Sequence, residues 1–348
     1  SSFTTKSASY QFSGNVSPVE ILTNNPEFAS EGITIYGNMS PFYSAALDMN
    51  GNEVWNSGGV DSYMFSSVDT NHTFLTFLGD ANLPPNYMGE LGIEFSIEDG
   101  VTWSQPTYGD EVDFLQHELI KLPNGNYMGF VPVIEQHPVP TYTNYPEQVT
   151  PFSWENDCGL YIEFNSNFDW KGEKIVEWNS AGEIVWEWNA FDYYSIDDFD
   201  YLAGEQEGHW NNICSLGGGA ISYDWIHFNA LTYDKIENEV NAVYVSSRHL
   251  DRITKIDYNS KEIIWNMGLQ WYGDTVIPFD DFFSGQHGLQ LLPNGNIVTL
   301  DNGTHSQIYI SGLGAPVSRA LEINVSESNG DYSATTVWSH TLPDDLYG

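Results

Sequence analysis

The chain has 348 residues, of which 41% are hydrophobic, and 48 acidic against 10 basic side chains give a formal net charge of −38. Nucleic acids and anionic membrane surfaces bind through clustered Lys and Arg, so neither is expected as a partner. No apolar run approaches the roughly 18 residues of a membrane span, so membrane insertion is not expected either.

The N-terminal stretch SSFTTKSASYQF lacks the basic and apolar regions of a signal peptide. Either the protein never had a signal peptide or the chain is the mature form of a secreted or periplasmic protein, and we favour the second. Residues 1–30 are expected to form a short β extension, and residues 31–348 the main domain. Cys158 and Cys214 form one disulfide in an oxidising compartment or are two unrelated buried thiols.

The acidic excess has two interpretations. It adapts the surface to a salty extracellular medium, or it binds structural calcium. The segment DMNGNE at residues 48–53 faintly resembles a calcium loop but lacks the full motif, and a simple hairpin turn explains it as well.

Two hairpin patterns recur along the chain. In the first, two strands flank a turn containing Gly or Asn and the second strand ends on a tryptophan, as in AALDMNGNEVWNSG. The five tryptophans are Trp55, Trp103, Trp186, Trp265 and Trp338. The second pattern precedes several of them, as in QHELIKLPNGN from Gln116, IHFNALTYDKIENEV from Ile226 and QHGLQLLPNGN from Gln286. Four strands per repeat predict an all-β fold, a β-propeller, with about five blades visible.

Three histidines occupy equivalent places at the start of the second pattern, namely His117, His227 and His287. The first strands of propeller blades line a central channel, so we expect these side chains to point toward one axis. Arg248, one of three arginines in the chain, ends the strand that returns from the His227 hairpin. His249 follows it and is expected to point to the opposite face of that strand.

Three imidazoles and one guanidinium form a small cationic pocket suited to a tetrahedral oxyanion such as sulfate or phosphate. Three histidines can also hold zinc, but Arg248 would repel a metal ion, so no metal is assigned. Tyr223 and Trp225 could border this pocket and stack on a phenol ring, with packing inside a blade as the alternative.

These residues resemble the arylsulfotransferase family, bacterial enzymes independent of PAPS and built on a six-bladed propeller. The segments QHELIKLPNGN, DWIHFN, VSSRHL and GQHGLQLLPNGNIVTLDNG follow in the family's order. The resemblance implies transfer of a sulfuryl group from a phenolic sulfate to a phenol through a sulfohistidine, with no cofactor required. It makes His287 the nucleophile and His227 the proton donor and acceptor. The sulfate oxygens would be bound by His117, Asn229 and Arg248.

Two other functions stay open. The chain could be a non-catalytic extracellular propeller with a scaffold role, as a homo-oligomer or in a surface assembly. It could also be a lyase or hydrolase acting on sulfated or acidic polysaccharide.

Overall fold

The computed structural model describes residues 31–39, 42–56, 61–68, 73–80, 91–96, 99–106, 117–138, 154–155, 161–162, 167–198, 222–236, 239–271, 273–304, 312 and 317–343. These residues belong to two compact units, Ser1–Leu115 and Gln116–Gly348. The β extension predicted for residues 1–30 lies outside the described residues.

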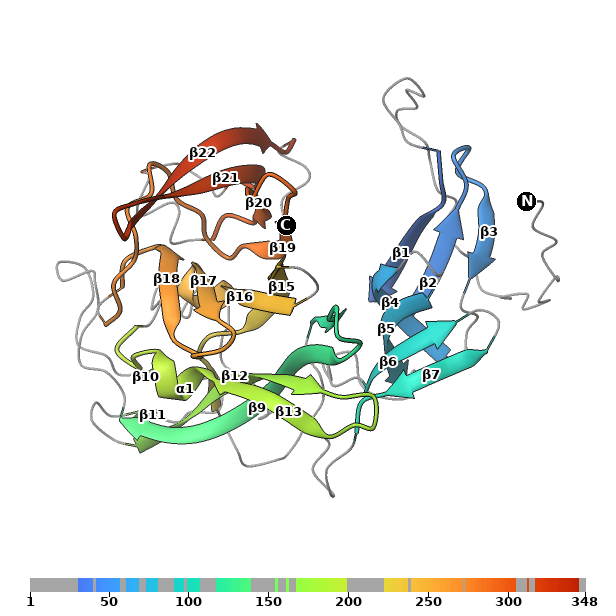
Figure 1. The fold of residues 1–348 in the computed structure, drawn as a ribbon, viewed down its shortest axis with the longest axis horizontal. Helices are drawn as coiled ribbons and strands as arrows, with labels where there is room; N and C mark the ends of the chain where they lie inside the picture. The colour runs from blue at the N-terminus through green and yellow to red at the C-terminus, as the bar shows by residue number, and fades with distance from the viewer. Residues whose placement is uncertain are drawn as a thin grey trace. The chain divides into compact units, whose positions relative to one another are not determined.

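The first unit contains two antiparallel sheets (Figure 1). The three-stranded sheet comprises β1 (Thr34–Met39), β2 (Phe42–Leu47) and β3 (Glu53–Asn56). The four-stranded sheet comprises β4 (Asp61–Val68), β5 (Thr73–Asp80), β6 (Leu91–Ser96) and β7 (Gly100–Ser104). Residues 48–52 of the DMNGNE segment form the turn between β2 and β3. The Asp48 carboxylate accepts hydrogen bonds from the backbone of Asn50 and Asn52 and from the Asn52 side chain, so the turn itself satisfies it.

The second unit begins with a five-stranded sheet in which the long strands β9 and β12 run side by side (Figure 1). Its strands are β8 (Leu119–Lys121), β9 (Tyr127–Pro138), β12 (Asn167–Trp178), β13 (Ile184–Asn189) and β14 (Ser222–Asp224). The antiparallel order is β13-β12-β9-β8, and β14 pairs parallel to β12. A separate pair, β10 (Trp154–Glu155) and β11 (Tyr161–Ile162), and a short helix, α1 (Ala190–Tyr193), accompany this sheet.

Two four-stranded antiparallel sheets complete the unit. One contains β15 (Phe228–Ile236), β16 (Glu239–Ser247), β17 (Arg252–Asp257) and β18 (Ile263–Gly268). A single 3-10 turn, η2 (Arg248–Leu250), joins β16 to β17. The other contains β19 (His287–Leu291), β20 (Ile297–Asp301), β21 (Arg319–Ser328) and β22 (Asp331–Thr341).

These five blade-like sheets, taken in chain order, are those of a β-propeller, as the repeats predict. All five repeat tryptophans lie in a strand at one end of the strand order of their sheets, namely β3, β7, β13, β18 and β22. Both LPNGN segments form tight turns of the same kind. In each, the leucine N–H donates to the last asparagine's carbonyl at 2.8 Å, and the glycine takes a φ of +85° (Gly125) or +83° (Gly295) that suits it best.

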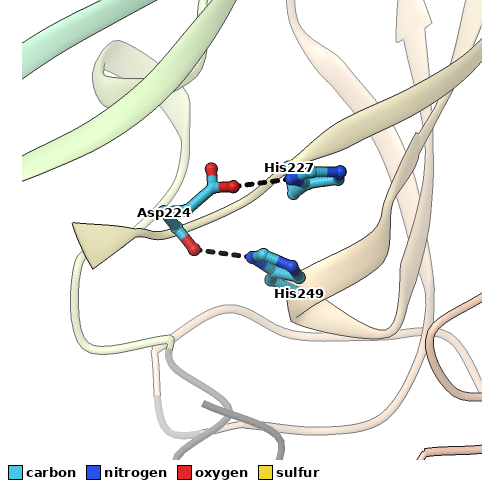
Figure 2. Close-up of side chains that lie close together, drawn as sticks. All are labelled: Asp224, His227 and His249. Carbon is cyan, nitrogen blue, oxygen red and sulfur yellow. Dashed lines mark hydrogen bonds and ion pairs between the residues drawn. The ribbon is translucent and has the colours of Figure 1, made fainter. Parts of the chain in front are cut away.

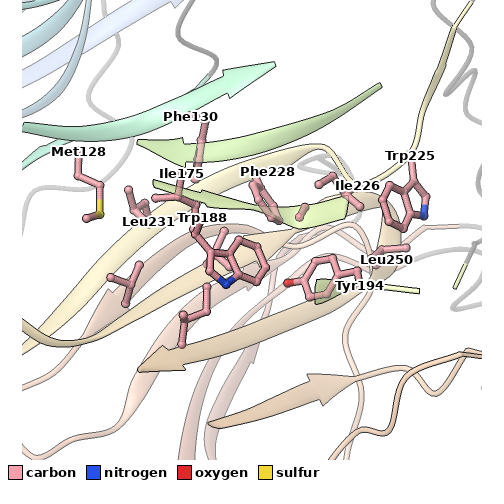
Figure 3. Packing of buried hydrophobic residues seen from close by; sticks show 14 of the residues in the cluster. Met128, Phe130, Ile175, Trp188, Tyr194, Trp225, Ile226, Phe228, Leu231 and Leu250 are labelled. Atoms are coloured by element: carbon pink, nitrogen blue, oxygen red, sulfur yellow. The ribbon is translucent and has the colours of Figure 1, made fainter. Parts of the chain in front are cut away.

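A hydrophobic core connects the first two sheets of the second unit (Figure 3). Trp188 is 1% exposed, and its ring centroid lies 6.4 Å from that of Phe228, the first residue of β15. The Trp188 indole N–H donates to the Lys261 carbonyl at 3.0 Å, so the burial leaves no unmet donor there. Because Phe228 is anchored in this core, the residue before it, His227, is fixed in space as well.

Candidate active site

The three predicted histidines come together at the starts of the first strands of three sheets. His117 lies two residues before β8, His227 lies directly before β15, and His287 is the first residue of β19. The Nε2 atoms of His117 and His227 are 2.7 Å apart. The ring centroids of His117 and His287 are 6.2 Å apart, with the rings nearly perpendicular. The repeats therefore predicted this convergence correctly.

The backbone at two of these histidines is strained. His117 and His227 have φ angles of +66° and +49°, in the left-handed region that a side chain with a Cβ rarely adopts. The carbonyl of His227 accepts the Arg248 backbone N–H at 3.0 Å, and this contact with η2 helps to hold the conformation. Residues held in such conformations concentrate at functional sites.

His227 forms a dyad with Asp224, the last residue of β14. The Nδ1–H of His227 donates to Asp224 Oδ2 at 2.6 Å, and Lys171 Nζ lies 3.6 Å from Oδ1. Burial by itself raises the pKa of the Asp224 carboxyl. The positive charge of Lys171 and the contact with His227 outweigh it and hold the pKa well below its usual range. An ionised Asp224 fixes the orientation of the His227 ring.

His287 is held from its Nδ1 side. This atom lies 3.0 Å from the Gly285 carbonyl and 2.7 Å from the Asn302 side-chain amide. The Gly285 carbonyl can only accept, so this contact places the proton on Nδ1 and the lone pair of the neutral ring on Nε2. The Asn302 atom at 2.7 Å is Nδ2, and two donors cannot share a hydrogen bond, so this assignment requires the Asn302 amide to be turned with Oδ1 toward the ring. Burial, with the nearby charge of Arg248, lowers the pKa of the His287 imidazole to about 4. At neutral pH this ring is uncharged.

His117 is uncharged as well. Burial, together with the neighbouring His227 and His287, lowers the pKa of His117 to about 2. The 2.7 Å contact between His117 and His227 therefore holds a single proton between two nitrogens. The histidine cluster therefore contains two neutral imidazoles, those of His117 and His287, and a third, that of His227, which is held by the Asp224 carboxylate.

Asn229 and Arg248 complete the predicted set. Asn229 is 6% exposed, and its Nδ2 donates to the carbonyl of Gln286, the residue before His287, at 2.6 Å. Arg248 lies close enough to His287 for its charge to act on that ring. The other two arginines form ion pairs, Arg252 with Asp198 and Asp274, and Arg319 with Asp281 and Asp301.

Comparison with known proteins yields one decisive match. The family model described as Arylsulfotransferase (ASST) matches residues 157–347, which is more than half of the chain and includes His227, Asn229, Arg248 and His287. The chain belongs to the arylsulfotransferase family. No curated protein matches the chain.

Solved structures resemble the chain only distantly. A protein of unknown function from Bacteroides caccae is 10% identical, with a TM-score of 0.45, covering 89% of this chain and 78% of that one. Hydrazine synthase from Kuenenia stuttgartiensis is 10% identical, with a TM-score of 0.36, covering 77% and 76%. Hsv2 from Kluyveromyces lactis is 6% identical, with a TM-score of 0.36, covering 90% and 85%. These scores carry no functional argument.

Two aromatic residues expected near the pocket are core residues of this arylsulfotransferase family member. Tyr223 and Trp225 are each 1% exposed, and both pack edge-on against Trp170. The Trp225 indole N–H donates to the Asp198 carbonyl at 2.7 Å. This placement favours packing inside a blade over contact with a phenol. Cys158 and Cys214 lie outside the described residues.

The prediction for His249 was wrong. The chain leaves the strand at Ser247, and η2 brings the His249 ring onto that of His227, with centroids 4.5 Å apart (Figure 2). Sequence reasoning also missed Asp224, although it stands three residues before His227 in the DWIHFN segment and was a detectable carboxylate partner. Both residues contribute to the geometry of the site.

Asp224, His227 and His249 offer ligand atoms within 4.8 Å of one another, which raises the question of a metal ion. The donor set fits one poorly. The Lys171 ammonium lies 3.6 Å from Asp224, and the Nδ1 atoms of both imidazoles are committed to hydrogen bonds with Asp224. The two rings also stack, so their lone pairs do not converge.

Within the part of the chain that the structure describes, no helix has the length and apolar character needed to cross a membrane.

Proposed function

We propose that this protein transfers a sulfuryl group from an aryl sulfate to a phenol through a sulfohistidine at His287. The observation that carries the proposal is the state of His287. Its Nδ1–H is held by the Gly285 carbonyl and its pKa is lowered to about 4, which leaves a neutral Nε2 lone pair beside the other imidazoles. Membership of the arylsulfotransferase family supports an enzyme of this kind.

In the first step, His287 Nε2 attacks the sulfur and the bond from sulfur to the phenolic oxygen breaks. The departing phenolate takes a proton from Nε2 of His227, which Asp224 holds through Nδ1. In the second step, the acceptor phenol returns a proton to His227 and its oxygen attacks the sulfur, releasing neutral His287. Atoms and charge balance over the two steps, and no external cofactor is consumed.

Arg248, His117 and Asn229 are proposed to bind the sulfate oxygens. By analogy with phosphoryl transfer, the transition state is loose and its charge spreads over the non-reacting oxygens, so fixed donors contribute most of the rate. The strained backbone of His117 supports this role, because it sets the ring before substrate arrives. We propose small phenolic sulfates as the donors, because the histidine cluster offers one oxyanion site.

The test mixes the protein with 4-nitrophenyl sulfate, with and without added phenol, and follows nitrophenolate release. Intact mass spectrometry of the sample without phenol looks for one added SO3 group. The expected result is release that depends on phenol, together with a mass adduct that is absent from His287→Ala. A matched control is His137→Ala in β9, a histidine stacked on Phe191. Without release or adduct in a folded protein, the scaffold alternative would replace this proposal.

A further inference from the structure

His249 is a buried imidazole that the proposed transfer does not use. It is 4% exposed, and its ring lies over that of His227 with an angle of 28° between the planes (Figure 2). A stacked contact between two histidine rings, one of them a proton carrier, requires a reason beyond the packing of apolar surface.

The His249 ring is fixed by the same residue that fixes His227. Its Nδ1–H donates to the Asp224 backbone carbonyl at 2.6 Å, while the Asp224 carboxylate accepts from His227 Nδ1 at 2.6 Å. The His249 backbone N–H donates to the Ile226 carbonyl at 3.1 Å. His249 is therefore tied to the segment 224–227 by its side chain and by its main chain.

The face of an aromatic ring carries partial negative charge and attracts a cation placed over it. When His227 holds its second proton, it becomes such a cation, and the His249 face lies against it. The contact is desolvated, which strengthens the attraction. The stacked ring also blocks rotation of the His227 ring away from its partners Asp224 and His117.

We infer that His249 is a positioning residue that holds the His227 ring in place and stabilises its protonated form. This inference rests on the proposed function, because it assigns His249 to the proton transfer to and from the phenolic oxygen. Other groups also act on the neighbourhood of His227 and are unchanged by substitution at His249. They are His117, Lys171, Glu173, Asp224, Arg248 and His287.

Two variants separate the ring contact of His249 with His227 from the hydrogen bond of its Nδ1 to the Asp224 carbonyl. His249→Phe keeps a ring over His227 and removes the hydrogen bond to Asp224. His249→Asn keeps an N–H donor near the Nδ1 position and removes the ring. His137→Phe and His137→Asn are matched controls, because His137 also stacks on a ring, that of Phe191 at 5.0 Å, outside the histidine cluster.

The measurement is the pH profile of kcat with phenyl sulfate, a donor whose phenolate needs protonation. With His249→Asn, the decline of kcat at high pH is expected to begin about 0.4 to 1.5 pH units lower, as the loss of a cation–π contact predicts. His249→Phe is expected to restore the profile to near that of the unaltered protein. Both His137 variants are expected to leave it unchanged.

An unchanged pH profile for His249→Asn would overturn the inference, as would a His249→Phe profile no better than that of His249→Asn. Thermal unfolding of each variant shows whether it is folded. The SO3 adduct on the unaltered protein separates the two proposals. Without that adduct the proposed function itself fails, whereas an adduct with unmoved profiles removes only the role of His249.

Discussion

Asp224→Asn tests the assignment of proton transfer to the His227 dyad. The substitution keeps an oxygen that can accept from His227 Nδ1 but removes the negative charge 2.6 Å from it. A hydrogen bond to a charged group contributes about 1.5–3 kcal/mol. The Asn variant keeps a neutral hydrogen bond of about 0.5–1.5 kcal/mol, so about 1–1.5 kcal/mol is lost where His227 is protonated. The rate then falls about 5- to 13-fold, because each 1.36 kcal/mol is a factor of ten.

The assay compares two donors that differ in the basicity of the departing phenolate. 4-Nitrophenolate is a weak base and leaves with little help, so Asp224→Asn should lower its release only a few-fold. Phenolate is a stronger base, so release from phenyl sulfate should show the full loss of about 5- to 13-fold. Asp281→Asn is the control, because Asp281 also pairs with a cation, Arg319 at 2.9 Å, outside the histidine cluster.

Equal losses with both donors would refute the reasoning. They would mean that Asp224 acts on binding or on folding rather than on the protonation of the leaving group. The same result in Asp281→Asn would show that a lost carboxylate anywhere in this unit lowers the rate. Urea unfolding of both variants measures the free energy of unfolding and shows whether a lower rate results from lost stability.

Three further predictions concern Glu173, Asn302 and the net charge of the chain. Burial and the charge of Asp224 raise the pKa of Glu173 to about 8, so above pH 4.5 the folded protein holds a proton on Glu173 that the unfolded chain releases. The stability that Glu173 contributes is therefore fully present below pH 4.5 and is lost as the pH rises through 8. Glu173→Gln should flatten this decline in urea unfolding at pH 6 and pH 9, and an equally steep decline in the variant would contradict it. Asn302→Ala removes one partner of His287 Nδ1 and should slow formation of the SO3 adduct about 2- to 13-fold. The rate is measured by intact mass spectrometry of samples quenched at successive times. An unchanged rate would contradict the prediction and show that Gly285 alone holds the ring. With a net charge of −38, the kcat/KM for an anionic aryl sulfate should rise as sodium chloride is added and screens the repulsion, and a falling kcat/KM would show that local attraction dominates.

The convergence of His117, His227 and His287 could be predicted because it depends on local signals. Strand alternation and Asn-Gly turns are set by neighbouring residues, and the gapless match between two LPNGN hairpins places His117 and His287 in equivalent positions. Since each blade repeats the same chain path, equivalent positions in sequence become neighbouring positions around one axis.

The surroundings of His227 could not be predicted in the same way, because they depend on contacts distant in sequence. The segment NAVYVSSRHL reads as one strand, yet the chain turns at Arg248 because the N–H groups of Arg248 and His249 donate to the carbonyls of His227 and Ile226. Asp224 is placed by parallel pairing with Lys171, more than fifty residues earlier. Neither contact leaves a periodic signal in the sequence.

The left-handed backbone of His117 and His227 has a consequence for directed evolution. A residue with a Cβ in this conformation costs about 1–2 kcal/mol, and glycine avoids the cost. A library selected for heat resistance alone would therefore enrich glycine at both positions, and the fittest survivors by that criterion would have lost the imidazoles. Selection for thermal stability therefore favours glycine at residues 117 and 227, whereas selection for turnover favours histidine.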